Sequence, residues 1–543
     1  MPRGIPALTR RRLSACGHRA MKAALWLTLT VPLLSASCGG GPDLISLDYG
    51  EAPERERAFL EPVLSPAVLE GLGLTGTGSG GTDRAAVELT FFSMYGTAET
   101  SVPGAVFPLS RTWYVPRTDP LEGRSGAGEG DRSRMLRGES GGAPGGGETL
   151  TPLRDLSPPY TALRVNGLSA GDPAYPLIKF TGLHIAVNGG GKAVKRLERK
   201  AAALREHILR SLEAAPELIE APPRLFWIAA GGDVMLGRGA SEILLREGPA
   251  GIFGESAAML AEADLALINL EGPLSVRGER VRKSFNFRFD PAAAAALKEA
   301  GIDAVLQANN HAFDYGERAF IDSLNHLSAA GIGAVGAGLN DEEAARPFVF
   351  KGPGGSAAVF GIASFPRENS GWDGLSAAAG PSQAGMLHAG RGGADLLKAW
   401  FSRTGDAADS AESPALNIVL FHGGHEWTRR PGAAVRELYT GLVKGGADLI
   451  IGSHPHVVQG FEWIDGKAVF WSLGNYVFGG MEDTGGGEEG LFIRLGYAGQ
   501  RLVYLEPYAL ILNHTRTSLG PPENLARFYA LSRELQNGGK GEL

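Results

Sequence analysis

From residue 225 onward, hydrophobic residues occur in short continuous runs, and each run ends in polar, glycine-rich sequence. The five runs are "RLFWIAAGGD" (224–233), "ADLALINLEG" (263–272), "IDAVLQANNH" (302–311), "ALNIVLFHGG" (415–424) and "ADLIIGSHPH" (447–456). Continuous rather than alternating apolar sequence predicts strands that are covered on both faces, as in an α/β sheet.

Helix-like segments lie between these runs, and three of them lead into the next strand through glycine, at Gly301, Gly331 and Gly445-Gly446. Glycine at this place fits the left-handed residue that ends many helices. Alternating strands and helices predict a layered α/β main domain over residues 225–480. Residues 481–543 read as further strands and a helix from Pro522 that complete its core.

The region before the main domain has a different pattern. Strand-like pieces such as "AVELTFFSMY" and "RTWYVP" predict a separate N-terminal α/β domain over residues 45–190, interrupted by a flexible loop at 122–148 that has almost nothing apolar to bury. Residues 163–180 weakly resemble the closing part of periplasmic substrate-binding domains. The domain is therefore either a module that delivers a solute or polymer or structural support.

An amphipathic helix is predicted to form a connector over residues 192–223. Its apolar positions recur at helical spacing: Val194, Leu197, Ala201, Leu204, Ile208 and Leu212. Prolines 216, 222 and 223 end the helix and mark a boundary.

The N-terminus predicts export. A basic stretch, the apolar segment "AALWLTLTVPLL" (23–34) and small residues before Cys38 are typical of a signal peptide with a lipidated cysteine over residues 1–38. We expect a lipoprotein tethered to a membrane of the cell envelope. The alternative is an uncleaved anchor in which Cys38 has no special role. The two cysteines, Cys16 and Cys38, both lie in this segment, so disulfides do not hold the body together.

Composition narrows the function classes. Hydrophobic residues make up 43% and charged residues 20% of the chain, as in ordinary globular proteins, and the net charge is -7. This balance gives no reason to expect nucleic acid as a partner.

Polar side chains follow each of the five apolar runs: Asp233, then Asn269 and Glu271, then Asn310 and His311, then His422 and Glu426, then His454 and His456. Open α/β sheets bind ligands beyond the carboxyl ends of their strands, so five segments are predicted to meet at one site. Taken singly, each residue has an ordinary alternative. The aspartate could cap a turn, and Asn309 and Asn310 could serve only to accept left-handed backbone geometry.

Imidazole, carboxylate and amide ligands without thiolate suit one or two divalent ions of Mn, Fe, Zn or Mg. His454 and His456 would point to opposite faces of an extended strand. Pro455 between them, after Gly452 and Ser453, is expected to bend the chain so that both rings reach the site.

Seven ordered blocks carry a family resemblance: "GGDVMLGR" (231–238), "NLEGPLS" (269–275), "FNFRFDP" (285–291), "NNHAFDYG" (309–316), "HGGHEW" (422–427), "GSHPHVVQ" (452–459) and "SLGNYVF" (472–478). They resemble the CapA family of poly-gamma-glutamate capsule biosynthesis proteins, which is similar to the calcineurin-like metallophosphoesterases. The resemblance covers roughly residues 225–480 and implies a metallophosphoesterase-like fold.

The resemblance also implies residue roles. The metal ligands would be Asp233, Glu271 (bridging two ions), Asn310, His422, His454 and His456. His311, Asp314 and Glu426 would take part in catalysis. Contacts to substrate would come from Arg238, Asn269, Lys283, Arg288 and Asn475. One departure is Met235, which stands where the phosphoesterases have a histidine ligand, so a site with a single metal ion is an alternative.

The expected activity is that of a metal-dependent hydrolase of phosphoesterase type, acting on a capsule or cell-envelope polymer or a small anionic substrate, with capsule synthesis or export proteins as partners. The alternative is a non-catalytic, membrane-tethered assembly or polymer-binding factor that uses the same fold.

Overall fold

The computed structural model describes residues 222–406, 416–481 and 484–538 without a break, and between residues 43 and 215 mainly the helices and strands. The described residues belong to two compact units. One is formed from residues 1–114 and 172–222, the other from residues 115–171 and 223–543. The predicted signal segment 1–38 and nearly all of the predicted loop 122–148 lie outside the described residues. The domain boundaries drawn from the sequence stay predictions.

The first unit is built on a sheet with one long helix. Its strands lie in the order β2 (Leu74–Thr75), β1 (Asp43–Leu47), β3 (Ala86–Gly96), β9 (Ile178–Asn188), β4 (Ala105–Thr118). Helix α4 (Lys192–Glu213) packs on β9 and β3. Leu197, Leu204 and Ile208 of α4 are fully buried. The predicted amphipathic helix is therefore confirmed, and it covers this sheet.

Short strands precede the main part of the second unit: β5 (Gly126–Ala127), β6 (Thr149–Pro152), β7 (Thr161–Ala162) and β8 (Arg164–Val165). The chain then forms two large sheets. The first runs in the order β13 (Gly333–Val335), β12 (Ala304–Leu306), β11 (Leu265–Leu270), β10 (Phe226–Met235), β23 (Glu489–Ala498), β24 (Arg501–Asn513), β25 (Arg516–Leu519), with β22 (Asn475–Phe478) also paired to β10. Its first four strands are parallel, and β23 joins β10 antiparallel.

The second sheet runs in the order β15 (Phe348–Lys351), β16 (Ser356–Ser364), β18 (Leu416–Gly423), β19 (Leu449–Ser453), β21 (Lys467–Phe470), β20 (Phe461–Ile464). Strands β16, β18, β19 and β21 are parallel. A two-stranded sheet of β14 (Ala337–Gly338) and β17 (Gly385–Met386) stands apart. The five predicted strands are thus β10, β11, β12, β18 and β19.

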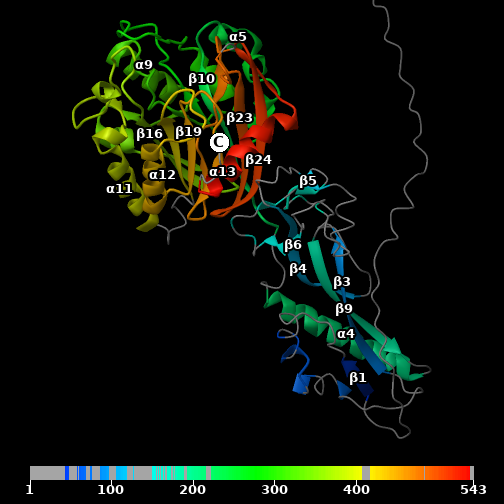
Figure 1. Cartoon of the computed structure of the whole chain (residues 1–543). Coiled ribbons are helices and arrows are strands. Elements are labelled where there is room, and N and C mark those ends of the chain that lie inside the picture. The colour runs from blue at the N-terminus through cyan, green and yellow to red at the C-terminus, as the bar shows by residue number, and fades with distance from the viewer. Residues whose placement is uncertain are drawn as a thin grey trace, which may run out of the picture. The chain divides into compact units, whose positions relative to one another are not determined.

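Three hydrophobic cores give the second unit its layers. The central core joins the facing sides of the two sheets, where Ile228, Leu267 and Leu306 meet Val359 and Ile418. A second core joins the outer face of the first sheet to α5 (Ala240–Glu247), α6 (Ala250–Phe253), α7 (Ser256–Ala261) and α8 (Ala293–Glu299). A third joins the outer face of the second sheet to α10 (Asp341–Ala345), α11 (Gly393–Asp406) and α12 (Ala433–Gly445). The layers are helices, sheet, sheet and helices, and Figure 1 shows α11 and α12 beside β16 and β19. The predicted layered α/β fold is confirmed.

Two further helices complete this unit. Helix α9 (Gly316–Ala329) follows β12, and its Phe320 and Leu327 enter the first two cores. The C-terminal η6 (Pro522–Leu525) and α13 (Ala526–Gln536) follow β25, and α13 packs against β20. There, the N–H groups of Phe461 and Trp463 donate to side chains of α13. The helix therefore covers the exposed edge of the second sheet.

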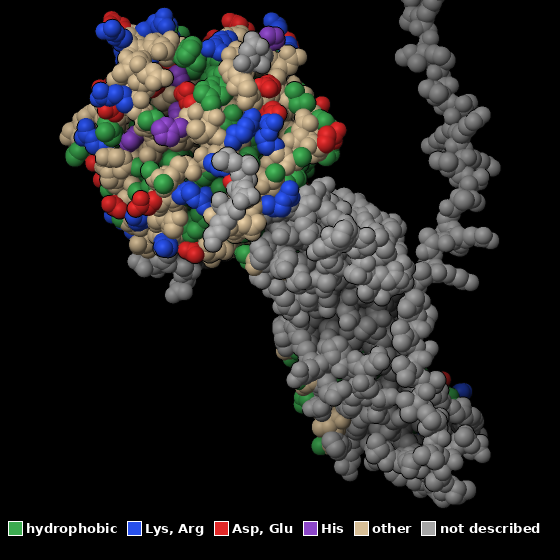
Figure 2. Space-filling view, viewed as in Figure 1, with side chains coloured by type: hydrophobic (Ala, Val, Ile, Leu, Met, Phe, Trp, Pro, Cys, Tyr) green, Lys and Arg blue, Asp and Glu red, His purple; other side chains and the backbone are tan. Residues whose placement is uncertain are grey.

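Glycine ends the predicted helices as expected. Gly301, Gly331 and Gly446 have φ of 91°, 72° and 119°, which is the left-handed region. Among the described residues, no helix has the length and apolar character needed to cross a membrane. Basic and acidic side chains are interspersed over the face of the second unit in Figure 2.

Candidate metal centre

The predicted site residues come from the carboxyl ends of parallel strands in both sheets. The close approach of β10 and β22 places the first of them. A Cβ on Gly232 would lie 1.9 Å from the backbone oxygen of Gly474, so only glycine fits there. This approach sets Asp233 beside Asn475 in the strand register. The Asp233 N–H donates to Gly474 O at 3.0 Å.

The first sheet contributes buried carboxylates held by amides. Asn269 Nδ2 donates to Asp233 Oδ1 at 2.7 Å and lies 3.3 Å from Glu271 Oε2. Asn309 Nδ2 in turn donates to Asn269 Oδ1 at 3.1 Å, which directs the Asn269 amino group toward the acids. Neither Asn309 nor Asn310 has positive φ, so the alternative that they serve a left-handed backbone is wrong.

The second sheet contributes imidazoles. His422 Nε2 lies 2.9 Å from Asn310 Oδ1 and 3.0 Å from His454 Nδ1. His454 and His456 both adopt positive φ, of 97° and 57°. This strained turn, rather than Pro455 alone, bends the chain so that both rings face the cluster. The predicted bend is confirmed.

Asp233 joins the two sets of side chains. Its Oδ2 accepts the His454 N–H at 3.2 Å and lies 3.3 Å from His456 Nδ1. The same nitrogen of His456 is 2.9 Å from Asn475 Oδ1, while Asn475 Nδ2 donates to Gly487 O. The structure therefore brings all six predicted metal ligands into one buried cluster. Asn269 and Asn475 form hydrogen bonds with metal ligands of this cluster.

The cluster fits a divalent cation. Asp233, Glu271 and His422 each offer a ligand atom, and these atoms lie within 4.8 Å of one another. Glu271 Oε1 is buried and has no hydrogen-bond partner among the residues that the structure describes, and it lies 3.7 Å from His456 Nε2. A buried carboxylate oxygen without a donor is costly, and a cation would satisfy it.

Electrostatics agrees with this fit. Burial, and then the charge of Asp233, raises the pKa of Glu271 well above its usual value. Burial would also raise the pKa of Asp233, but the hydrogen bond and charge of His456 outweigh it and the pKa is lowered. Burial, followed by neighbouring imidazoles, lowers the pKa of His422 and brings that of His454 to about 3. Neutral imidazoles are the form that binds metal ions.

The three residues predicted to be catalytic differ in position. His311 Nδ1 is 2.6 Å from Asp314 Oδ2, and both side chains are buried. Phe287 lies against the His311 ring, at 4.3 Å between centroids, and its N–H donates to Asp314. Glu426 is exposed on the segment after β18, and its charge contributes to the raised pKa of Glu271.

The predicted substrate contacts do not all converge. Lys283 is enclosed beside Asp314, with its side chain 1% exposed. Arg238 donates to Gly479 O and lies over the ring of Phe287. Arg288 is exposed and stacks on Tyr315, and the contacts described for it do not reach the cluster. Met235 is buried and its sulfur accepts the N–H of Gly237.

Sequence reasoning missed three residues beside the cluster. Phe365 faces the rings of His422 and His454, and Trp372 stacks on Phe365 at 6.1 Å. Glu368 accepts a hydrogen bond from Asn310 Nδ2. All three follow β16, whose apolar run "SAAVFGIAS" also ends in polar residues, and this signal could have added a sixth segment.

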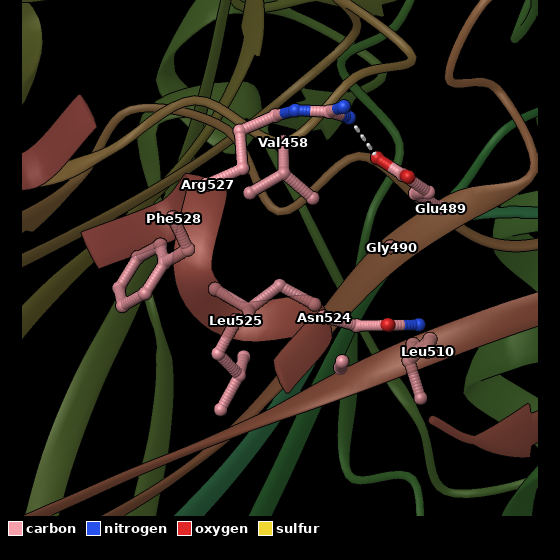
Figure 3. A pocket seen from close by; sticks show the side chains of 10 residues that line it. Val458, Glu489, Gly490, Leu510, Asn524, Leu525, Arg527 and Phe528 are labelled. Carbon is pink, nitrogen blue, oxygen red and sulfur yellow. Dashed lines mark hydrogen bonds and ion pairs between the residues drawn. The ribbon is translucent and has the colours of Figure 1, made fainter. Parts of the chain in front are cut away.

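A small pocket lies elsewhere. It is lined by residues of β23, β24, η6 and α13 and by Val458. Figure 3 shows the ion pair of Arg527 and Glu489 there. None of the predicted site residues lines this pocket, so it is separate from the metal centre.

The family model of the bacterial capsule synthesis protein PGA_cap matches residues 227–480. This segment belongs to that family. The resemblance predicted from the seven blocks is therefore confirmed. All six predicted ligands lie within the PGA_cap segment.

Curated relatives match a comparable share of the chain. The capsule biosynthesis protein CapA of Bacillus anthracis is 30% identical over 252 residues, which cover 46% of this chain and 58% of that protein. The PGA biosynthesis protein CapA of Bacillus subtilis (strain 168) is 27% identical over 250 residues, which cover 46% of this chain and 62% of that protein. A probable polyglutamine synthesis accessory protein of Mycobacterium tuberculosis is 28% identical over 297 residues, which cover 47% and 75%. The match thus spans about three fifths of the length of the two Bacillus proteins.

Two solved structures are similar at a lower level. A hypothetical protein from Thermus thermophilus has 14% identity and a TM-score of 0.33, covering 53% of this chain and 100% of that one. A 5'-nucleotidase from Candida albicans has 12% identity and a TM-score of 0.30, covering 57% and 55%. TM-scores this low do not by themselves relate two folds.

Proposed function

We propose that this chain is a metal-dependent hydrolase of phosphoesterase type that serves the synthesis or export of a capsule or cell-envelope polymer, such as poly-gamma-glutamate. The observation that carries the proposal is the buried cluster of Asp233, Glu271 and His422, in which no group of the described part of the chain donates a hydrogen bond to Glu271 Oε1. The PGA_cap segment and the names of its relatives support the cellular role.

The residues of the cluster would have two roles, metal binding and proton transfer. Asp233, Glu271, Asn310 and the histidines would hold one or two divalent ions, and the bound metal would polarise the scissile group of the substrate. The His311 ring is oriented by Asp314, which accepts at 2.6 Å, so its Nε2 is the atom placed to hold or donate a proton. Phe287 covers one face of that ring and excludes water from it.

The setting of the protein is part of the proposal. Lipidation at Cys38 would tether the chain to a membrane of the cell envelope, where an anionic polymer or small anionic substrate would reach the site, together with capsule synthesis or export proteins as partners. The N-terminal unit would either deliver substrate or support the fold.

The test is the metal content of the full-length chain, measured by inductively coupled plasma mass spectrometry after metal is resupplied. We expect one or two ions in the wild type and a loss of bound metal in His454→Ala and Glu271→Ala, because each removes a ligand. A folded wild type without metal would leave the alternative of a non-catalytic assembly or polymer-binding factor. Hydrolysis of a generic phosphodiester that requires metal and is lost in Asn310→Ala would establish catalysis.

A further inference from the structure

The ammonium group of Lys283 is saturated with acceptors beside the metal centre. Its Nζ donates to the backbone oxygen of Asn310 at 2.5 Å and to Asp314 Oδ1 at 2.8 Å, and it forms an ion pair with Glu368 Oε1 at 2.9 Å. An ammonium has three protons to donate, and three oxygens already lie within 2.9 Å of this one. Lys283 can therefore bind an anionic substrate only by releasing one of these acceptors.

The three acceptors are not equivalent. Asn310 and Asp314 belong to the segment after β12, and Asp314 is fully buried and also accepts from Phe287 N and His311. Glu368 comes from the segment after β16, in the second sheet, and its side chain is 20% exposed. Glu368 is thus the acceptor that can leave without exposing a buried charge.

Glu368 belongs to a tight turn that lies on Lys283. The Glu368 N–H donates to Trp372 O at 2.9 Å, and the Gly371 N–H donates to Glu368 O at 2.8 Å. The Trp372 ring lies 4.3 Å from Lys283 Nζ, a cation-π contact. Phe365 stacks on Trp372 and faces His454. The turn at residues 368–372 therefore covers the lysine, and Phe365 just before it covers the edge of the histidine cluster.

Glu368 Oε1 also occupies a position suited to a substrate group. Besides its ion pair with Lys283, it accepts from Asn310 Nδ2 at 3.3 Å, while the oxygen of the same amide faces His422 at 2.9 Å. A lysine and an amide N–H beside predicted metal ligands are donors that an oxyanion would use. The carboxylate of Glu368 has the same charge and acceptor chemistry as such a group.

We propose that Glu368 is the exchangeable partner of Lys283, and that an oxyanion of the substrate, phosphate or carboxylate, takes its place. This inference rests on the proposed function, since the anion would bind next to the metal centre. When the exchange occurs, Lys283 and Asn310 hold the substrate anion and the turn at 368–372 detaches. Because Glu368 competes with the anion for Lys283, it lowers the affinity of this site for anions.

The test is calorimetric titration of inorganic phosphate into the manganese-loaded full-length chain. Glu368→Gln should bind phosphate about tenfold more tightly than the wild type, equal to ~1.4 kcal/mol, because a neutral amide competes less well for Lys283. Glu247→Gln removes a carboxylate paired with Arg516 elsewhere on the surface and should leave the Kd unchanged. Glutarate in a parallel titration separates a preference for carboxylates from one for phosphate, and tightening for either anion supports the exchange.

The titrations separate the loss of the Glu368 exchange from the absence of a metal centre. A metal-loaded Glu368→Gln protein that binds neither anion more tightly overturns the exchange and leaves the metal centre standing. If the chain holds no metal, the same titrations on the metal-free protein still compare Glu368→Gln with the wild type, and tightening there supports the exchange alone.

Hydrogen exchange provides a second readout that does not depend on a variant. Saturating phosphate should speed amide exchange in the wild-type peptide covering residues 366–374, because the turn loses its contact with Lys283. The peptide covering α12 serves as an internal reference. Unchanged or slower exchange in the 366–374 peptide at saturating phosphate would overturn the proposal.

Discussion

The two sheets of the second unit supply opposite kinds of ligand to one site. The first sheet contributes what we call the acidic half: Asp233, Asn269 and Glu271. The second contributes the imidazole half: His422, His454 and His456. Neither half is a complete set of metal ligands by itself. The comparison teaches that the site exists only where the two sheets pack face to face.

The two halves also differ in how the protein shifts the pKa values of their side chains. In the acidic half, the pKa of Glu271 is raised by burial and by the charge of Asp233, so one more negative charge is unfavourable there. In the imidazole half, burial and neighbouring rings hold the pKa of His422 well below its usual value. His456 differs from its neighbours: burial would lower its pKa, but the hydrogen bond and charge of Asp233 outweigh burial and raise it. A cation next to Glu271 would favour the charged form of this carboxylate, which burial and Asp233 disfavour.

The most direct way to break the comparison is Asp233→Asn, because Asp233 contacts both halves. The variant keeps the shape but removes the charge, and it leaves one oxygen where two now accept hydrogen bonds, from Asn269 Nδ2 and the His454 N–H. We expect divalent metal to bind at least about a hundredfold more weakly, as loss of partners around ligands alone costs 10- to 100-fold. Titration of Mn²⁺ monitored by calorimetry measures the change.

Asp264→Asn is the control for that prediction. Asp264 accepts the N–H of Trp227 just before β11 begins, at the opposite end of the strand from the cluster. Equal losses of metal affinity in Asp233→Asn and Asp264→Asn would show that the effect comes from the fold and not from the two halves.

A second prediction disturbs the imidazole half without touching a ligand. A Cβ on Gly452, which lies in β19 just before His454, would come within 2.0 Å of Trp471 O and 2.6 Å of Tyr439 Oη. Gly452→Ala should therefore lower the free energy of unfolding by about 1–3 kcal/mol or more. Urea denaturation followed by circular dichroism checks this value.

Gly441→Ala is the matched control. Gly441 lies inside α12, where a Cβ would meet nothing within 4 Å. Alanine there should raise stability by roughly 0.5–1 kcal/mol through helix propensity. If the two glycine variants behaved alike, close packing behind the imidazole half would not be what holds β19 in place.

The smallest effect concerns a carboxylate near the first sheet but outside the acidic half. Hydrogen bonds from Arg516 and Arg246 lower the pKa of Glu247 from 4.5 to about 2. Because the pKa of Glu247 is lower in the folded protein than in the unfolded chain, the ionised carboxylate stabilises the fold at pH values above 4.5. This contribution to the free energy of unfolding is lost as the pH falls from 4.5 toward 2. The difference in urea midpoint between wild type and Glu247→Gln should therefore shrink between pH 6 and pH 3. A difference that grows in acid would contradict the assignment.

Much of the acidic half and the imidazole half could be predicted because strand ends are visible in the sequence. Asp233, Glu271 and His422 each follow or end an apolar run, and the parallel arrangement brings such ends to one edge. Arg288 shows the limit of this reasoning. It lies in a family block, yet it stacks on Tyr315 at the surface, because the course of a long loop is set by partners distant in sequence.

For the same physical reason, the sequence did not predict Glu368 and Trp372 as site residues. Their segment follows an apolar run that ends in polar residues like the other five, but it carries no histidine, and nothing in the sequence pairs it with Lys283. Their importance comes from Lys283, 85 residues earlier in the chain (368 − 283 = 85), which they meet only after the sheets have packed.

The sequence by itself determined the strands, the glycine helix ends, the family of residues 227–480 and the residue types at the site, because apolar periodicity and backbone preferences act locally. Tertiary structure alone decided which nitrogen faces which oxygen, that Asn269 binds both carboxylates, and that Lys283 is shared between the two sheets. These are contacts between segments far apart in the chain, and their geometry depends on how two twisted sheets pack around one core.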